Sequence, residues 1–428
     1  MDSDARLENY ADLLGEGEIR ELQVLASPLR GLRLQHINST ATGGGVAEIL
    51  TRLVPLLQDV GVDAVWTVLD GTPEFFQVTK AFHNALHGQS APLTPPMLQC
   101  YREVLARNRD KVEGAADVVV LHDPQPVGLA EYRHSHSGRW VWRCHIDLTQ
   151  ADPMVWGFLR GYVERCDAAV LHLPEYARDL VIEQYVISPA IDPFTEKNRD
   201  LDHSEIGGVC ARFGIDRSRP IVLQVSRFDW LKDPLGVVQA YRLIRKSADC
   251  QLVLAGGGAA DDPEGQEVLA KVRESAGKDP DIFILDLPPD SHFEINALQR
   301  AATVVVQKSI REGFGLVVTE AMWKGKPVVG GNVGGIRRQI LHGETGYLAN
   351  TLEGAAWYIR ELLVNRTLAE RMGTLAREHV RTNYLFPHYL RSWLLVLLGL
   401  RQAGDGIFSL PEAARAAPRS GAPSSRML

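Results

Sequence analysis

Two cations stand at the end of a segment that has the apolar pattern of a buried strand. The segment is Pro220–Phe228, and Arg227 and Lys232 lie five positions apart at its end and just beyond it. An arginine offers a planar fork of donors and a lysine offers a compact charge, so the two together suit a pyrophosphate group. Two solvated surface cations are the alternative interpretation, and this segment alone leaves both open.

A second group of candidates combines carboxylates with glycines in the segment Arg311–Glu320 (REGFGLVVTE). Its glycines come between a strand and the predicted helix Leu316–Lys324, where backbone N–H groups can face the hydroxyls or phosphates of a ligand. Glu312 precedes this helix and Glu320 lies inside it, eight positions later, a placement that fits bidentate binding of vicinal sugar hydroxyls. For Glu320 alone, an ordinary glutamate on a helix surface is the alternative. The candidate loop residues are Gly313, Phe314 and Gly315.

A glycine loop in Asn38–Val46 (NSTATGGGV) joins a predicted strand to the predicted helix Val46–Val60. Consecutive glycines let the backbone approach a ligand, and the helix N-terminus points free N–H groups at an anion. The segment matches neither the dinucleotide fingerprint nor the Walker loop, and a tight turn with a purely structural role is the alternative. Gly44 and Gly45 are the candidate ligand-binding residues.

The elements that must position these residues follow from an alternation of short apolar runs with helical patterns along the chain. This alternation predicts βαβ units and therefore parallel sheets, and the same pattern restarts after about residue 190. We therefore predict an α/β fold with two doubly wound, Rossmann-like domains that face one another across a cleft. Ligands of such sheets bind beyond the carboxyl ends of the strands, which is where the candidate residues fall.

The predicted domains are an N-terminal domain over residues 1–190 and a C-terminal domain over residues 191–400. The polar segment Ser188–Glu205 is typical of a connection between them. Residues 401–428 are rich in Ala, Pro and Ser, a composition that predicts a disordered tail. The apolar segment Tyr389–Leu400 follows the last element that the second domain needs, and it can pack back on the N-terminal domain.

Composition narrows the function classes. The 428 residues carry a formal net charge of −7, which argues against a nucleic-acid partner. The five cysteines are spread singly, as expected for free thiols in a reducing compartment. No apolar run reaches the length of about 18 residues that a membrane span needs, and the acidic N-terminus does not have the pattern of a signal peptide. We expect a cytoplasmic enzyme without a membrane partner.

Together these segments resemble a known family. The spacing of Glu312 and Glu320 is similar to the E-x7-E motif of retaining, nucleotide-sugar-dependent glycosyltransferases of family 4, which have the GT-B fold. Arg227 and Lys232 match that family's diphosphate-binding pair, and the glycine loop matches its N-terminal donor loop. Within the family, the trehalose synthase branch is closer still, over the segments WRCHIDL, IDPFTEKN and SIREGFGLVVTEAMWKGKPVVGG. The resemblance covers roughly residues 30–400.

The resemblance implies a reaction in which a nucleoside diphosphate glucose gives its glucose to free glucose, forming α,α-trehalose reversibly and with retention. Arg227 and Lys232 would then stabilise the departing diphosphate. Glu312 and the backbone of the following loop would hold the donor sugar, and Glu320 would hold the ribose. His145 would bond the sugar near its 6-hydroxyl, with a structural core histidine as the alternative. The residues implied at the acceptor are His83, Asn84 and Asp147, with capping or surface roles as the alternative.

The resemblance implies no obligatory cofactor, because protein cations can replace a divalent metal, and it leaves stimulation by Mg²⁺ open. The partners would be a nucleoside diphosphate glucose, glucose and trehalose; a homodimer is one open assembly. A retaining trehalose phosphorylase and another nucleotide-sugar-dependent glucosyltransferase are the neighbouring alternatives. A nicotinamide-dependent oxidoreductase would need a GxGxxG strand exit that the chain lacks, and a non-catalytic binding module would show no turnover.

Overall fold

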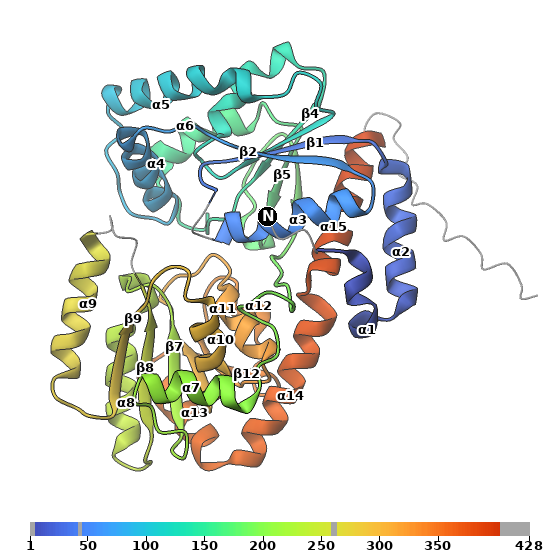
Figure 1. Cartoon of the computed structure of the whole chain (residues 1–428). Coiled ribbons are helices and arrows are strands. Elements are labelled where there is room, and N and C mark those ends of the chain that lie inside the picture. The colour runs from blue at the N-terminus through green and yellow to red at the C-terminus, as the bar shows by residue number, and fades with distance from the viewer. Residues whose placement is uncertain (1–4, 42–44, 258–262, 403–428) are drawn as a thin grey trace, which may run out of the picture.

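The computed structural model describes residues 5–41, 45–257 and 263–402, and within them it has two lobes with one six-stranded sheet each (Figure 1). Every strand pair in both sheets is parallel. The N-terminal lobe has the order β2-β1-β3-β4-β5-β6, from strands β1 (Arg33–Asn38), β2 (Asp63–Val68), β3 (Val118–His122), β4 (Arg139–Arg143), β5 (Ala168–Leu171) and β6 (Glu183–Val186). The C-terminal lobe has the order β12-β11-β10-β7-β8-β9, from strands β7 (Ile221–Val225), β8 (Gln251–Gly256), β9 (Ile282–Asp286), β10 (Val304–Gln307), β11 (Val328–Gly331) and β12 (Gly346–Ala349).

Helices cover the faces of both sheets, as they do in doubly wound folds (Figure 1). In the N-terminal half these helices are α1 (Ala11–Leu14), α2 (Glu16–Ala26), α3 (Gly45–Asp59), α4 (Pro73–Leu86), α5 (Pro95–Asn108) and α6 (Pro153–Val163). In the C-terminal half they are α7 (His203–Arg212), α8 (Pro234–Arg245), α9 (Pro263–Ala276), α10 (His292–Ala301), α11 (Leu316–Trp323), α12 (Ile336–Gln339), α13 (Leu352–Val364), α14 (Arg366–Asn383) and α15 (Phe386–Gln402).

The strands form because short apolar runs can be buried on both faces only inside a sheet that is covered on both sides. β3 and β10 show this most clearly, since all residues of both strands are buried. The edge strand β6 differs: its sequence EQYV is half-buried or exposed along its length, and the apolar-run criterion did not predict it.

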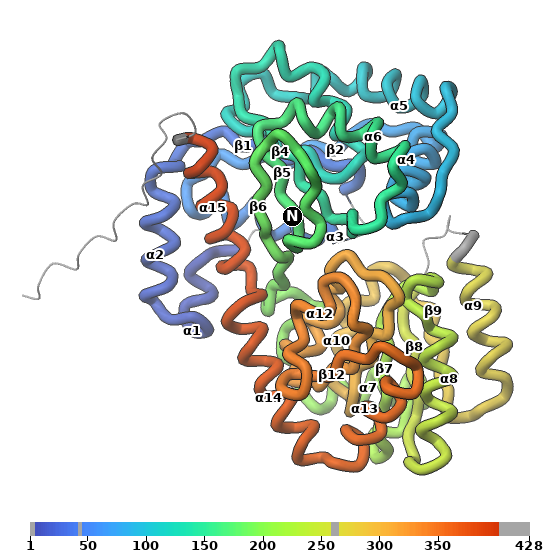
Figure 2. The backbone as a smooth tube through the Cα atoms, turned by 180° about the vertical axis from the view of Figure 1, so that it is seen from behind, coloured from blue at the N-terminus to red at the C-terminus, as the bar shows by residue number. Residues whose placement is uncertain are grey.

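The chain crosses between the lobes twice, at two segments that lie side by side. Ile191 donates its backbone N–H to the carbonyl of Tyr384 at 2.9 Å, and Phe386 donates to the carbonyl of Ile191 at 3.2 Å. α14 lies on the C-terminal lobe and α15 continues from it onto the N-terminal lobe (Figure 2). The expected boundary near residue 190 stays a prediction, and the predicted tail lies outside the described residues from residue 403 onward.

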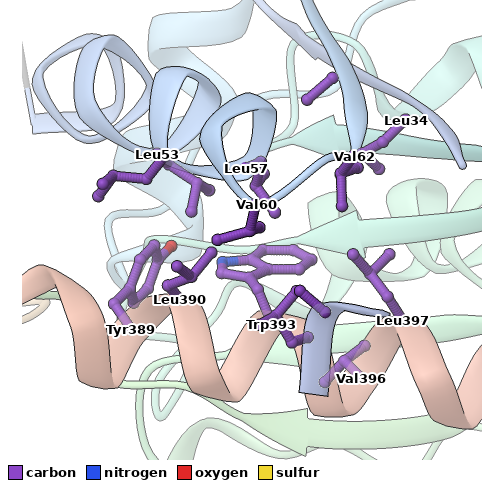
Figure 3. Packing of buried hydrophobic residues seen from close by; sticks show 14 of the residues in the cluster. Leu34, Leu53, Leu57, Val60, Val62, Tyr389, Leu390, Trp393, Val396 and Leu397 are labelled. Atoms are coloured by element: carbon purple, nitrogen blue, oxygen red, sulfur yellow. The ribbon is translucent and has the colours of Figure 1, made fainter. Parts of the chain in front are cut away.

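α15 packs its apolar face against the N-terminal lobe, between α2 and α3. Trp393 is fully buried among side chains of α3 and of the segment that follows it, with Leu57 and Val60 close to its ring (Figure 3). A fully buried large apolar side chain stabilises a fold by about 1.5–3 kcal/mol. The packing of α15 therefore fastens the end of the described chain to the first lobe. Within the described ranges, none of the helices combines the length and the apolar character that crossing a bilayer requires.

Candidate active site

The structure brings the predicted cation Lys232 and the predicted carboxylate Glu312 into direct contact. Lys232 follows β7 on a short 3-10 turn, and its Nζ lies 2.7 Å from both carboxylate oxygens of Glu312. Ser309 donates its hydroxyl to Glu312 Oε2 at 3.1 Å, and Gln224 donates to the backbone carbonyl of Lys232 at 2.8 Å. Two sequence motifs 80 residues apart thus form one charged group at the carboxyl ends of β7 and β10.

Arg227 lies at the same sheet edge and is the more exposed of the two cations. Its guanidinium is 3.6 Å from the carboxylate of Asp229, with 59% of the side chain accessible. It lies close enough to α4 of the other lobe for its positive charge to lower the pKa of His83 and of His87. Burial first, and then His87 and Arg227, lower the pKa of His83 to about 3. The cation-bearing loops and the α4 acceptor candidates therefore lie opposite one another.

The loop that is predicted to hold the donor sugar (residues 313–315, the donor loop) has contacts on both sides. Gly315 has φ +85°, a left-handed conformation that glycine adopts readily. A Cβ on Gly313 would lie 2.9 Å from the backbone carbonyl of His145, so the first lobe approaches this loop closely. The hydroxyl of Tyr176 donates to the carbonyl of Gly313 at 2.8 Å, and Phe314 is buried. The loop is thus clamped between the lobes.

The start of α3, in the first lobe, lies beside the start of α11, just after this loop. α3 begins at Gly45, and a Cβ there would lie 3.8 Å from Leu316 Cδ1 at the start of α11. The N-termini of α3 and α11, each a donor-rich end, therefore lie close together. Gly44, the other predicted residue of this loop, lies outside the described residues.

Glu320 is covered in this structure. Its side chain has no accessible surface, and Lys197 Nζ lies 2.8 Å from Glu320 Oε1 and 3.3 Å from Glu48 on α3. Burial alone would raise the pKa of the Glu320 carboxyl, but the charges of Lys197 and Lys324 outweigh it and the net pKa is lowered. A ribose can reach this carboxylate only if Lys197 moves. Sequence reasoning missed Lys197, although it belongs to the segment IDPFTEKN that carried the resemblance.

The geometry changes the role expected of His145. Its Nε2 lies 3.0 Å from His122 Nδ1 and its Nδ1 lies 3.1 Å from His172 Nε2, so neither ring nitrogen is free for a sugar hydroxyl. Its backbone carbonyl, by contrast, faces the donor loop. Its backbone N–H donates to the carboxylate of Asp123 at 2.6 Å, and Asp123 itself has φ +66°, a strained conformation of the kind that concentrates at functional sites.

The acceptor candidates lie on two segments that Arg311 joins. Asp147 accepts from the backbone N–H and the hydroxyl of Thr149, at 2.9 and 2.6 Å, which is a local turn contact. Arg311 donates to the carbonyl of His87 at the end of α4 and to the side chain of Gln150. Asn84 is half-buried and directly follows His83 on α4. A cavity of about 220 Å³ between the lobes is lined in part by Asp147, Gln150, Tyr176 and Arg311.

Sequence reasoning missed Arg311 and His87, and the signal was available for both. Arg311 directly precedes Glu312, and His87 lies four residues after His83, directly after the end of α4. The two rings are 4.7 Å apart between centroids. Burial and the charges of Lys232, Arg311 and Arg227 lower the pKa of His87 to about 4, which puts an uncharged ring beside three cations.

Comparison with known proteins gives this arrangement a family. Residues 36–178 match the family model "Trehalose synthase, N-terminal domain", and residues 211–379 match "Glycosyl transferases group 1". A trehalose synthase of Pyrococcus horikoshii is 44% identical over 92% of this chain and 96% of its own length. The chain belongs to the trehalose synthase family of glycosyltransferases. The resemblance expected from its motifs is therefore confirmed.

Two further comparisons place the trehalose synthase family among its neighbours. A trehalose phosphorylase of Pleurotus pulmonarius is 29% identical over 87% of this chain, and the match spans 58% of that protein. The solved structure of a sucrose-phosphate synthase from Thermosynechococcus elongatus superposes with a TM-score of 0.69 at 19% identity, over 87% of this chain and 99% of that one. This likeness confirms the predicted GT-B fold with its two Rossmann-like domains.

Proposed function

We propose that this chain transfers glucose from a nucleoside diphosphate glucose to free glucose, giving α,α-trehalose with retention of the anomeric configuration. The observation that carries the proposal is the contact of Lys232 with Glu312 beside Arg227, opposite the N-terminus of α3, in a chain that is 44% identical to a trehalose synthase. This charged group lies at the carboxyl ends of β7 and β10, and ligands of doubly wound sheets bind at such ends.

The leaving group is the first requirement. A lysine ammonium has three donors, and two of those of Lys232 are taken by the oxygens of Glu312. The third remains for a phosphate oxygen, and the exposed guanidinium of Arg227 adds a second cation. Breaking the bond between the anomeric carbon and the phosphate oxygen places negative charge on the diphosphate, and fixed cations stabilise that charge in the transition state.

The donor sugar is the second requirement. Glu312 accepts from Lys232 and Ser309 and still has lone pairs for sugar hydroxyls. The wall beside the donor sugar would consist of Gly313, Phe314 and Gly315. Because glycine has no side chain, the sugar could come close enough to contact the backbone there. Gly45, at the start of α3, would face the diphosphate, and Glu320 would face the ribose once Lys197 withdraws. His145 would contribute its backbone carbonyl rather than its ring.

The acceptor glucose would lie between α4 and the segment after β4, near His83, Asn84 and Asp147. The new bond joins the acceptor's anomeric oxygen to the donor's anomeric carbon on the face that the phosphate leaves. The proton of that acceptor hydroxyl passes to the departing phosphate oxygen, so atoms and charges balance without a protein nucleophile. Arg311 ties both acceptor segments to the other lobe, and closure of this kind excludes water that would hydrolyse the donor.

No cofactor is required in this proposal, because Arg227 and Lys232 supply the positive charge that a divalent cation supplies elsewhere. Within the parts of the chain that the structure describes, no cluster of three His, Cys, Asp or Glu side chains is arranged to hold a metal ion. We propose a cytoplasmic location.

The test is a panel of ADP-, UDP- and GDP-glucose, each incubated with free glucose and the purified protein. We expect a non-reducing disaccharide of two glucoses and an equal amount of released nucleoside diphosphate from at least one donor. Loss of trehalose that depends on inorganic phosphate and not on nucleotide would instead assign the phosphorylase reaction. Release of glucose from the donor without any disaccharide would contradict the proposal.

A further inference from the structure

Four histidines from four neighbouring strands form one continuous hydrogen-bonded chain across the N-terminal sheet. His36 Nδ1 lies 3.0 Å from His122 Nε2, and His122 Nδ1 lies 3.0 Å from His145 Nε2. His145 Nδ1 lies 3.1 Å from His172 Nε2. They stand on β1, at the end of β3, just after β4 and just after β5. The histidine chain consists of His36, His122, His145 and His172.

The histidine chain is uncharged; three of its members are buried and His145 is half-buried. His36, His122 and His172 are at most 3% accessible. Burial lowers the pKa of His36 to about 3 and lowers the pKa of the other three well below their usual range. Each ring therefore carries one proton at neutral pH. In the described residues, the two terminal nitrogens, Nε2 of His36 and Nδ1 of His172, have no hydrogen-bond partner.

Counting protons shows that the four rings must share one tautomer. The histidine chain has three contacts between nitrogen atoms and two terminal nitrogens. Each contact needs one proton, because two protons would clash and a contact without a proton would set two lone pairs against each other. Four uncharged rings bring four protons, so three fill the contacts and one remains for a single end. The rings are therefore either all protonated on Nε2 or all protonated on Nδ1.

The charge of Arg143 decides between these two forms. Arg143 is buried, and its guanidinium donates to the backbone carbonyl of Ile187 at 2.8 Å. Ile187 donates its own backbone N–H to Leu171, the residue before His172, so the charge of Arg143 lies toward the His172 end. In keeping with this, that charge lowers the pKa of His122, His145 and His172 but does not act on His36. The bare nitrogen should lie at the end near the guanidinium and the proton at the end far from it. The Nε2–H form meets both conditions, because it leaves Nδ1 of His172 bare.

The end near Arg143 is also the end that meets the proposed donor site. The ring of His172 lies 6.0 Å from the ring of Phe314, nearly perpendicular to it, and the carbonyl of His145 faces Gly313. At the other end, the ring of His36 lies 5.7 Å from that of Trp393 on α15. The histidine chain thus runs from α15 to the donor loop.

We propose that the histidine chain is a positioning device: its single shared tautomer fixes His145 and His172 as the rigid wall against which the donor loop closes for glucosyl transfer. His122, which bonds a ring on either side, is its central positioning residue. The functional part of this inference rests on the proposed function, whereas the shared tautomer does not.

The tautomer is tested by two-bond ¹⁵N–¹H correlation spectra of protein labelled at histidine, with the four rings assigned by single substitutions. We expect all four as uncharged Nε2–H rings from pH 6 to pH 8. Different tautomers among the four rings, or a charged ring, would overturn the shared tautomer. Four Nδ1–H rings would overturn the orientation assigned from Arg143. This outcome is independent of whether trehalose is formed.

The positioning role is tested with two variants of one site. An asparagine amide can reach the place of Nδ1 and a glutamine amide the place of Nε2, so His122→Asn keeps the contact with His145 whereas His122→Gln keeps only that with His36. We expect His122→Gln to lower kcat and kcat/KM together, by up to about 100-fold, and His122→Asn to keep most of the wild-type kcat. His134→Gln, on an exposed residue of the same lobe, is the control.

Wild-type kcat in His122→Gln would overturn the positioning role. So would equal losses in both variants that follow equal losses of thermal stability, because a merely structural residue would behave in that way. If the wild type forms no trehalose, the proposed function fails, and the spectra still test whether the four rings of the histidine chain share one tautomer.

Discussion

A double-mutant cycle on Lys232 and Glu312 separates the stability that their ion pair provides from the role that we propose for Lys232 at the diphosphate. The side chains are 19% and 9% accessible, and the ammonium lies 2.7 Å from both carboxylate oxygens. Breaking a fully buried pair costs about 3–5 kcal/mol because it leaves an unpaired charge. Since this pair keeps some contact with solvent, we expect Lys232→Met to lower the free energy of unfolding by about 2 kcal/mol.

Glu312→Gln removes the unpaired charge that Lys232→Met creates. We therefore expect the double variant to regain much of the lost stability, with a coupling energy of about 1–3 kcal/mol between the two positions. Activity should behave differently, because a diphosphate still needs the ammonium. Lys232→Met should lower kcat by about 10²–10³-fold, and the double variant should not regain it.

The assays are denaturant unfolding and initial rates of nucleoside diphosphate release with glucose as acceptor. The exposed pair Lys271 and Glu267, also 2.7 Å or closer on one helix, is the matched control and should show coupling below about 0.5 kcal/mol and no rate change. If the double variant of Lys232 and Glu312 recovers rate together with stability, the reasoning about the diphosphate is refuted.

Four more outcomes are expected. Burial lowers the pKa of Lys324 to about 7, against about 10.4 in the unfolded chain. Between these two pH values the unfolded state binds a proton that the folded state lacks. The unfolding free energy of the wild type should therefore rise with pH relative to that of Lys324→Met, by up to about 1.4 kcal/mol per pH unit. Arg311→Ala should raise the ratio of donor hydrolysis to transfer, measured as glucose released per trehalose formed, because its bonds to the first lobe help to exclude water. Trp393→Ala should lower the unfolding free energy by about 3–5 kcal/mol, while Trp357→Ala, on a residue that is 64% exposed, should change it by less than about 0.5 kcal/mol. Chelation with EDTA should leave the transfer rate within about twofold if the protein cations suffice.

Much of the fold could be predicted because its strands are short, doubly buried apolar runs. β3 and β10 show that signal along their whole length. The edge strand β6 does not, because its polar residues face solvent and its pairing with β5 is made by the backbone. α2 was not predicted either, since its packing partner, α15, lies more than 350 residues away in the sequence.

The candidate site could be predicted as separate motifs but not as an arrangement. Residue types and spacing identified Lys232 and Glu312, whereas their contact follows only from the topology that puts β7 beside β10. Lys197 could not be found from spacing, because a lysine in a polar connection has the composition of a surface residue until its contacts are known. The histidine chain could not be found for the same reason, because each member alone suits an ordinary strand or the residue that follows one.

The most direct measurement is a crystal structure of the protein with a nucleoside diphosphate and glucose bound. The account predicts the diphosphate between the N-terminus of α3 and the side chains of Arg227 and Lys232, the ribose at Glu320 with Lys197 displaced, and glucose beside His83 and Asp147. A nucleotide bound away from Arg227 and Lys232, with their charges facing solvent, would contradict it.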